Sequence, residues 1–154
     1  DLNKNLLVKV KKIKAKHVIS LVVDAIINKK IISHFKGRIY SSHEGILPNY
    51  RGYDCTAWSI LNNERYVGIS LQKISSGVDD GKIVWVSKIK VNKFKNLESF
   101  YKKLYYKYKL TYFKNLIINL KNNKKINFLK KKGYGKQYFE MHKDLLNIVK
   151  EKIR

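Results

Sequence analysis

Two short apolar segments separated by a helical pattern constrain the fold more than any other feature of the sequence. Residues 17–23, HVISLVV, have the length and apolar composition of a fully buried strand. Residues 25–35 repeat apolar side chains at helical spacing, with Asp24 as the expected N-cap and Gly37 as the residue that ends the helix. Residues 38–42 have the pattern of a second strand. This order predicts an α/β unit with parallel strands, which places functional side chains at the carboxyl ends of its strands.

An antiparallel pair of strands is predicted to extend this sheet. Residues 66–74 alternate, with Val67 and Ile69 on one side. Residues 82–91 form a second apolar run after the glycine-containing turn 75–81. The remaining elements expected from the apolar pattern are helices over residues 6–16, 54–63, 97–122 and 143–153 and a loop over residues 132–139. The long helix should pack on the sheet because its aromatic side chains recur at helical spacing.

The positive charge of the chain is large but widely spread. The 154 residues include 34 Lys and Arg against 11 Asp and Glu, which gives a net charge of +23. Lysine occurs throughout the chain together with Asn, Ile and Tyr, a residue set that A/T-rich coding sequences accumulate. The densest runs, 119–125 and 129–136, are interpreted either as a solvated surface or as a site for phosphate or a nucleic acid backbone.

Cysteine content and hydropathy restrict the setting of the protein. No apolar run approaches the roughly 20 residues that span a bilayer, so no membrane association is expected. Cys55 is the sole cysteine, which excludes an internal disulfide and a cysteine zinc cluster. A chain without disulfides favours the reducing cytoplasm, and no metal site is predicted.

Two polar loops are the candidate functional segments. His43 follows the strand 38–42, and the loop after it contains Pro48 and the five-donor guanidinium of Arg51. Asp79 lies in a tight turn that the fold can bring to the same sheet edge. A carboxylate beside an imidazole sets its tautomer and supports proton transfer. The sequence therefore predicts an acid–base pair within hydrogen-bond or one-water reach, and the alternative is a structural histidine beside an ordinary turn.

The motifs in and between these loops resemble those of the folate-dependent formyltransferases. They read H-x-G-x-L-P-x-Y-R-G over residues 43–52, V-G-I-S-L-Q-K-I over 67–74 and G-V-D-D-G-K-I-V over 77–84. That family includes methionyl-tRNA, glycinamide ribonucleotide and nucleotide-sugar amine formyltransferases. The resemblance covers about residues 17–84 and implies the C-terminal part of a catalytic domain. It implies a partial Rossmann-like α/β fold, with parallel strands, an appended antiparallel pair and packed helices. Residues 1–154 would form a single domain that lacks the family's N-terminal β-α units.

The resemblance also implies roles for individual residues. His43 and Asp79 correspond to the catalytic histidine and aspartate of the family. Ser41 falls where the family has a catalytic asparagine, so a single hydroxyl replaces a fixed amide. The loop that closes on the pterin of the formyl donor, 10-formyltetrahydrofolate, corresponds to Ser75, Ser76, Gly77, Val78 and Asp79.

Several functions remain open on the sequence. A primary amine on a nucleotide-linked sugar is the favoured acceptor, because Arg51-Gly52 followed by Trp58 resembles the sugar-modifying branch. Methionyl-tRNA is the rival acceptor, for which the basic surface would be useful. A non-catalytic relic of the fold is a further alternative, motivated by Ser41 and the missing N-terminal units. The last alternative is a basic nucleic-acid-binding domain without folate chemistry.

Overall fold

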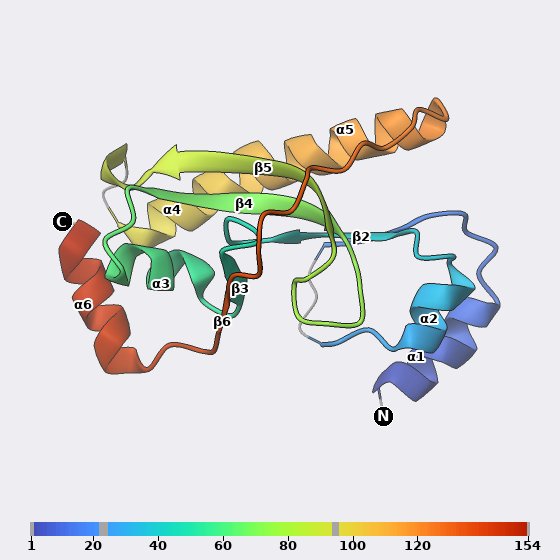
Figure 1. Cartoon of the computed structure of the whole chain (residues 1–154), viewed down its shortest axis with the longest axis horizontal. Helices are drawn as coiled ribbons and strands as arrows, with labels where there is room; N and C mark the ends of the chain where they lie inside the picture. The colour runs from blue at the N-terminus through green and yellow to red at the C-terminus, as the bar shows by residue number, and fades with distance from the viewer. Residues whose placement is uncertain (1, 22–24, 94–95, 154) are drawn as a thin grey trace.

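The computed structural model describes residues 2–21, 25–93 and 96–153 (Figure 1). Within these residues the main sheet has the strand order β1-β2-β4-β5. Its strands are β1 (Val18–Ser20), β2 (Ile39–His43), β4 (Tyr66–Lys73) and β5 (Lys82–Lys90). β1 and β2 are parallel, whereas β4 is antiparallel to both β2 and β5. The predicted α/β fold, with parallel strands and an appended antiparallel pair, is confirmed.

The alternation predicted for β4 matches its packing. Val67, Ile69 and Leu71 are fully buried in the main core. β5 pairs with β4 along its length, and the register shifts between Leu71 and Gln72. Such a bulge re-aims the side chains that follow it.

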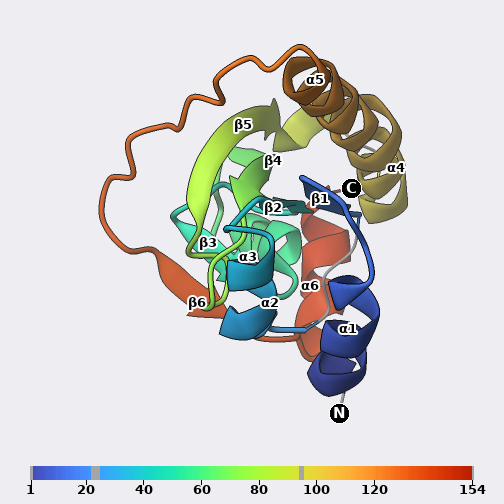
Figure 2. The same ribbon diagram turned by 90° about the vertical axis from the view of Figure 1, so that its right-hand side faces the viewer.

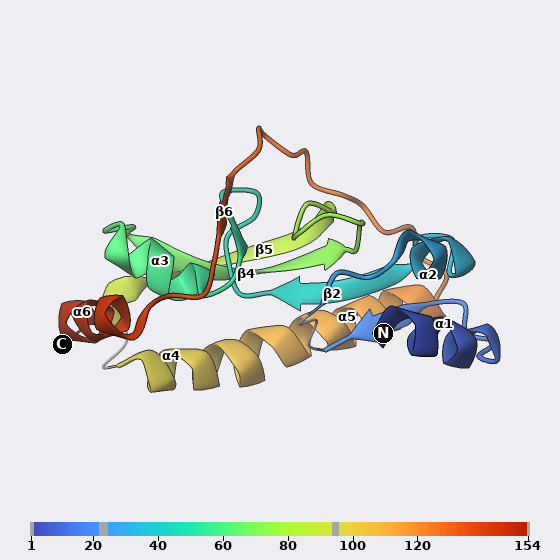
Figure 3. The same cartoon turned by 90° about the horizontal axis from the view of Figure 1, so that it is seen from below.

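One continuous helical stretch covers a face of the sheet (Figure 3). It consists of α4 (Leu97–Lys103), a π-helical segment η2 (Leu104–Lys109) and α5 (Leu110–Lys121), so the predicted long helix is confirmed. Asn96 caps its start, because its Oδ1 accepts a hydrogen bond from the Ser99 backbone N–H at 2.8 Å. The side chains that it buries in the main core are Phe100, Leu104, Tyr112, Phe113 and Leu116.

A second, two-stranded parallel sheet joins distant parts of the chain. β3 (Tyr50–Gly52) pairs with β6 (Lys136–Tyr138). The prediction of a loop over residues 132–139 was therefore wrong at β6, a three-residue strand that pairs with a strand far away in the sequence. Figures 2 and 3 show β6 on the side of the main sheet opposite to α4 and α5.

Two further helices, far apart in the sequence, pack together. α3 (Cys55–Leu61) follows β3, and α6 (Lys143–Ile153) packs against it. The predicted final helix over 143–153 is confirmed, and α3 lies within the predicted range 54–63.

The N-terminal elements differ from the prediction in their boundaries. α1 spans Leu2–Lys11 and α2 spans Lys29–His34. Asn28 caps α2, since its Oδ1 accepts from the Lys30 backbone N–H at 2.8 Å, so the helix starts four residues later than residue 25. Asp24, the expected cap, lies outside the described residues. None of the helices in the described ranges is both long and apolar enough to cross a membrane.

Candidate active site

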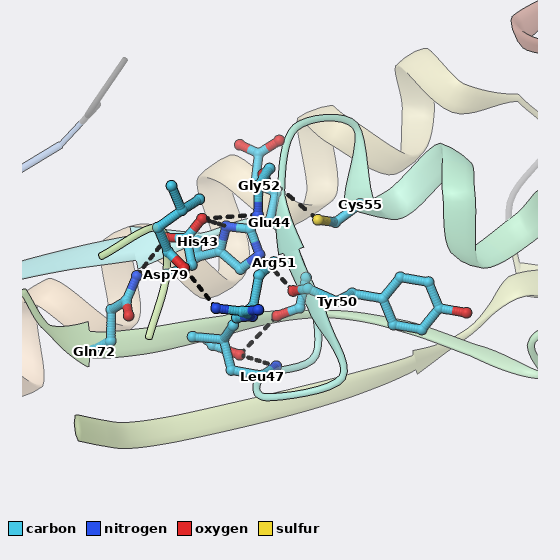
Figure 4. Close-up of polar contacts among 12 residues, drawn as sticks. His43, Glu44, Leu47, Tyr50, Arg51, Gly52, Cys55, Gln72 and Asp79 are labelled. Carbon is cyan, nitrogen blue, oxygen red and sulfur yellow. Dashed lines mark hydrogen bonds and ion pairs between the residues drawn. The ribbon is translucent and has the colours of Figure 1, made fainter. Parts of the chain in front are cut away.

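The two candidate loops meet at the end of β2. His43 Nδ1 lies 3.2 Å from Asp79 Oδ2, so the predicted contact between the histidine ring and the carboxylate is present (Figure 4). On the other side of the ring, Nε2 lies 2.8 Å from the backbone carbonyl oxygen of Tyr50. The His43 side chain is buried, with 8% of its residue surface exposed.

Both ring nitrogens of His43 therefore face oxygen atoms. The Tyr50 carbonyl can only accept, so Nε2 carries a hydrogen. Nδ1 faces a carboxylate oxygen, and this contact is favourable when a proton lies between the two atoms. The arrangement makes Nε2 the donor to the Tyr50 carbonyl and places Nδ1 against Asp79 Oδ2.

Asp79 is held by donors on both carboxylate oxygens. Oδ2 also accepts from the Gly52 backbone N–H at 3.0 Å, and Oδ1 accepts from Gln72 Nε2 at 2.6 Å. Asp79 has a positive φ of 44°, a conformation that few residues other than glycine adopt. Gln72, which follows the bulge in β4, was missed by the sequence reasoning, although a glutamine in an apolar strand is a signal.

Arg51 connects the Asp79 loop to the C-terminal part of the chain. Its Nη1 donates to the Val78 carbonyl oxygen at 3.4 Å, and its Nη2 donates to the Gly135 carbonyl oxygen at 3.0 Å. The sequence indicated a donor at this position, but the two loops that it joins could not be inferred.

Residues 135–141, called here the C-terminal strap, hold β3 in place. The Tyr138 ring stacks on the Tyr50 ring at a centroid distance of 5.0 Å and an angle of 10°. Gly52 has a φ of 92° and lies so close to the Tyr138 carbonyl that any side chain would collide with it. Because β3 supplies the Tyr50 carbonyl to His43 and the Gly52 N–H to Asp79, the strap supports both residues of the pair.

The strap has two further anchors, one on α3 and one at the residue that precedes it. Trp58 Nε1 donates to the Phe139 carbonyl oxygen at 2.8 Å. The Met141 backbone N–H donates to Asp54 Oδ2 at 2.8 Å. Asp54 thus uses its carboxylate to bind the strap and makes no side-chain cap on α3.

A cavity of about 590 Å³ lies beside the pair. Its polar wall contains Ser41, His43, Gln72 and Asp79, and Ser41 and Gln72 are register partners on β2 and β4. Its apolar wall is formed by Leu21, Ala25, Ile26, Ile27, Ile74 and Val78. Of the predicted donor loop, Ser75, Gly77, Val78 and Asp79 line the cavity, whereas Ser76 is exposed and lies off the wall.

Two other titratable groups on the cavity wall stay protonated. Burial, followed by the charges of Asp79, Asp54 and Glu44, raises the pKa of the Cys55 thiol. Burial, followed by the charge of Glu44, raises the pKa of the Tyr101 phenol. A thiol with a raised pKa is a poor nucleophile, so Cys55 is poorly suited to attack a substrate in the cavity. Within residues 2–21, 25–93 and 96–153, no three His, Cys, Asp or Glu side chains are grouped to bind a metal ion.

The chain matches a known family model over more than half of its length. The model described as Formyl transferase covers residues 2–116. The methionyl-tRNA formyltransferase of Finegoldia magna is 33% identical over 87 residues, which cover 56% of this chain and 28% of that protein. The chain thus spans less than a third of the length of this relative.

Solved structures of formyltransferases are also similar to this chain. WlaRD, a sugar 3N-formyl transferase in the presence of dTDP and 5-N-formyl-THF, is 30% identical with a TM-score of 0.68, covering 80% of this chain and 44% of that chain. The formyltransferase PseJ from Anoxybacillus kamchatkensis, in complex with UDP-4,6-dideoxy-4-formamido-L-AltNAc and tetrahydrofolate, is 24% identical with a TM-score of 0.71, covering 82% of this chain and 65% of that chain. At this level of identity, the similarity to PseJ shows a shared fold.

Proposed function

The chain belongs to the formyl transferase family, and from this premise we propose that it transfers a formyl group from 10-formyltetrahydrofolate to a primary amine. The observation that carries the proposal is the His43–Asp79 contact at 3.2 Å beside the cavity. We further propose that residues 1–154 are the C-terminal part of one catalytic domain, to which N-terminal β-α units would add. The lone cysteine supports a cytoplasmic setting, where thiols remain reduced.

The first step is attack of a neutral amine on the formyl carbon. The formyl oxygen then becomes an oxyanion, which the Nδ1–H of His43 and the Ser41 hydroxyl stabilise. Ser41 supports this role because it is buried on the same strand as His43 and lines the same cavity. Asp79 accepts the proton that the attacking nitrogen loses, directly or through one water.

The second step breaks the bond between the formyl carbon and N10 of the folate. His43 gives its Nδ1 proton to the leaving nitrogen, and the proton on Asp79 then returns to His43. The products are a formamide and tetrahydrofolate, and the pair regains its starting protonation. The Tyr50 carbonyl keeps the ring oriented throughout, because it binds Nε2 and leaves Nδ1 to react.

The donor binds in the cavity beside the predicted loop. A pterin is flat and largely apolar on its faces, which suits the wall formed by Ile26, Ile27 and Val78. Ser75 and Gly77 supply polar groups at its edge. The assignment of residues 75–79 to binding of the folate donor stays a proposal. Ser75, Gly77, Val78 and Asp79 support it because they line the cavity.

A nucleotide-linked amino sugar is the proposed acceptor. The 30% identity to WlaRD, a sugar 3N-formyl transferase, supports it. Methionyl-tRNA is the second candidate, supported by the 33% identity to the Finegoldia magna enzyme.

The test is a formyl-transfer assay with 10-formyltetrahydrofolate and each acceptor in turn. Formamide formed on a nucleotide amino sugar, and lost in a His43→Ala variant that remains folded, is the expected result. Product with charged tRNA alone would replace the sugar assignment. No transfer, together with no heat on titration with 5-formyltetrahydrofolate, would identify the chain as a non-catalytic relic.

A further inference from the structure

The acceptor of the proposed reaction has one more proton to lose than Asp79 accepts. Primary amines are mostly protonated at pH 7, because their pKa values run from about 8 for an α-amino group to about 10.4 for a lysine side chain. An ammonium nitrogen has no free electron pair, so it loses one proton before it attacks the formyl carbon and a second one afterwards. Asp79 takes the second proton in the mechanism above. The first proton therefore goes to another group of the site or to water.

Several titratable groups on the cavity wall are poorly suited to take this first proton. Both ring nitrogens of His43 and both carboxylate oxygens of Asp79 already have partners. Asp54 uses its carboxylate to bind the C-terminal strap. Burial raises the pKa of the Cys55 thiol and of the Tyr101 phenol, so both groups stay protonated.

Glu44 supplies a further carboxylate on the cavity wall. It directly follows His43, lines the same cavity and is half-buried. Thr56 Oγ1 donates to the Glu44 backbone carbonyl oxygen at 3.4 Å, which attaches this residue to α3. Among the residues that the structure describes, the Glu44 carboxylate has no hydrogen-bond or ion-pair partner, and Figure 4 shows it apart from the His43–Asp79 contact. The side chain is therefore available to a ligand in the cavity.

The charge of Glu44 acts on the part of the wall that α3 and the long helix form. After burial, this charge is the main cause of the raised pKa of Tyr101. Lys109 is 5% exposed on the same wall, where its Nζ lies 4.7 Å from the centre of the Tyr105 ring. The titratable groups around Glu44 on the cavity wall are His43, Asp54, Cys55, Asp79, Tyr101 and Lys109.

The overall charge of the chain makes a local carboxylate important for an ammonium ligand. A net charge of +23 repels cations from the surface as a whole. A half-buried carboxylate beside His43 attracts a cation to the point where the reaction takes place. An ammonium group that binds there is also within a site that shields the pair from bulk ions.

We propose that Glu44 binds the acceptor as an ammonium ion and takes the proton that converts it to the neutral amine. This inference rests on the proposed function. One N–H bond of the ammonium ion breaks, its electron pair stays on nitrogen, and the proton forms an O–H bond with Glu44. The neutral nitrogen then attacks the formyl carbon, and Asp79 takes its second proton. After the product leaves, Glu44 releases its proton to water, so one proton enters the solvent for each formamide formed.

The experiment is the pH dependence of kcat/KM for formyl transfer to a dTDP-linked 3-amino sugar, measured from pH 7 to 10. The wild-type protein uses the ammonium form of the acceptor, so its kcat/KM should stay nearly constant below the pKa of the acceptor amine. Glu44→Gln uses only the neutral amine. Its kcat/KM should therefore fall about 10-fold for each pH unit below that pKa and should approach the wild-type value above it.

Two further variants and a binding measurement serve as controls. Glu151→Gln removes the same charge at an exposed position of α6 and should keep the wild-type profile. Glu44→Asp retains a carboxylate and should keep a nearly constant kcat/KM below the pKa of the acceptor, at a lower rate. In isothermal titration with the acceptor alone at pH 7, Glu44→Gln should bind on the order of 10-fold more weakly than the wild-type protein.

The outcomes separate this inference from the proposed function. Parallel pH profiles of the wild-type protein and Glu44→Gln would overturn the inference, whether the rates are equal or uniformly lowered. Equal affinities of the two proteins for the acceptor at pH 7 would overturn the ammonium contact. In both cases, transfer by the wild-type protein would leave the proposed function in place. If the wild-type protein transfers no formyl group to the amino sugar or to charged tRNA at any pH, the proposed function fails and this inference with it.

Discussion

Gln72 Nε2 lies 2.6 Å from Asp79 Oδ1 and thereby fixes the carboxylate oxygen that His43 does not contact. Gln72 is 3% exposed, and within the described residues its Oε1 has no hydrogen-bond partner. Gly81 lies next to this arrangement, where a side chain would collide with the Lys73 carbonyl and would also press on Gln72 Oε1. A buried, half-satisfied amide is costly, and its hydrogen bond to Asp79 favours a positioning role for Gln72.

Gln72→Ala should slow formyl transfer about 10-fold by lowering kcat, with KM little changed. The reason is that Asp79 keeps its contacts with His43 and Gly52 but loses the hydrogen bond from Gln72, which orients the plane of its carboxylate. Steady-state kinetics and thermal unfolding on the same samples separate positioning from folding. Gln137→Ala, at an exposed glutamine, is the control, and a proportional rise in KM would contradict the assignment.

His43→Ala should abolish formyl transfer. In the wild-type protein, nitrogen NMR of the His43 ring should find Nε2 protonated throughout the pH range in which the protein is active. The Tyr50 carbonyl accepts from that nitrogen, so only Nδ1 exchanges its proton. His34→Ala removes an exposed histidine and should leave the rate unchanged. A spectrum with the hydrogen on Nδ1 alone would refute the tautomer assigned here.

Ser41→Asn should increase kcat, because a fixed amide donor replaces a rotating hydroxyl at the oxyanion. In other enzymes, removal of one such donor lowers kcat by roughly 10²- to 10³-fold, and this factor is the upper bound of the expected increase. The change is measured as kcat for formyl transfer, with Ser76→Asn in the exposed part of the donor loop as control. A slower enzyme with an unchanged melting temperature would mean that Ser41 is not at the oxyanion.

Tyr138→Ala should lower both stability and activity, since the ring stacks on Tyr50 and the strand supports the pair. Loss of the stacking alone costs about 0.5 to 1.5 kcal/mol in free energy of unfolding, and lost burial adds to it. Urea unfolding measures the first effect and the transfer assay the second. Phe139→Ala, which removes a 70% exposed ring, should change neither the free energy of unfolding nor the transfer rate. Full activity in the Tyr138→Ala variant would contradict a role of the strap in supporting the site.

Cys55 should resist alkylation in the folded protein and should weaken the fold at alkaline pH. Burial raises its pKa above the ordinary 9.0, so the unfolded chain releases the thiol proton at a lower pH than the native state does. The free energy of unfolding is therefore unaffected by this group below about 9 and falls as pH rises further. Denaturant titrations from pH 7 to 10 should show a shallower fall for Cys55→Ala, and rapid iodoacetamide labelling at pH 8 would count against a buried thiol.

Local chemistry made part of the site predictable. The His43 loop and the Asp79 turn could be found because Pro, Gly and Asp mark turns, and because the ends of neighbouring strands converge. The chemical roles of His43, Asp79 and Ser41 remain predictions, to be tested by the variants above.

Other parts of the site depend on packing that the local pattern does not record. Asn28 caps α2, and Ala25, Ile26 and Ile27 line the cavity outside that helix, although their spacing suits a helix. The bulge after Leu71 sets where Gln72 points, and β6 owes its pairing to a strand far away in the sequence.

The pairing of Tyr50 with Lys136 determines when the site can form during synthesis. The ribosome delivers the chain from its N-terminus, so both loops of the acid–base pair emerge well before the strand that steadies them. A nascent chain that ends before residue 136 holds His43 and Asp79 without the support of β6 for β3. The geometry of the His43–Asp79 pair should therefore reach its supported form only after residues 136–138 have left the ribosome.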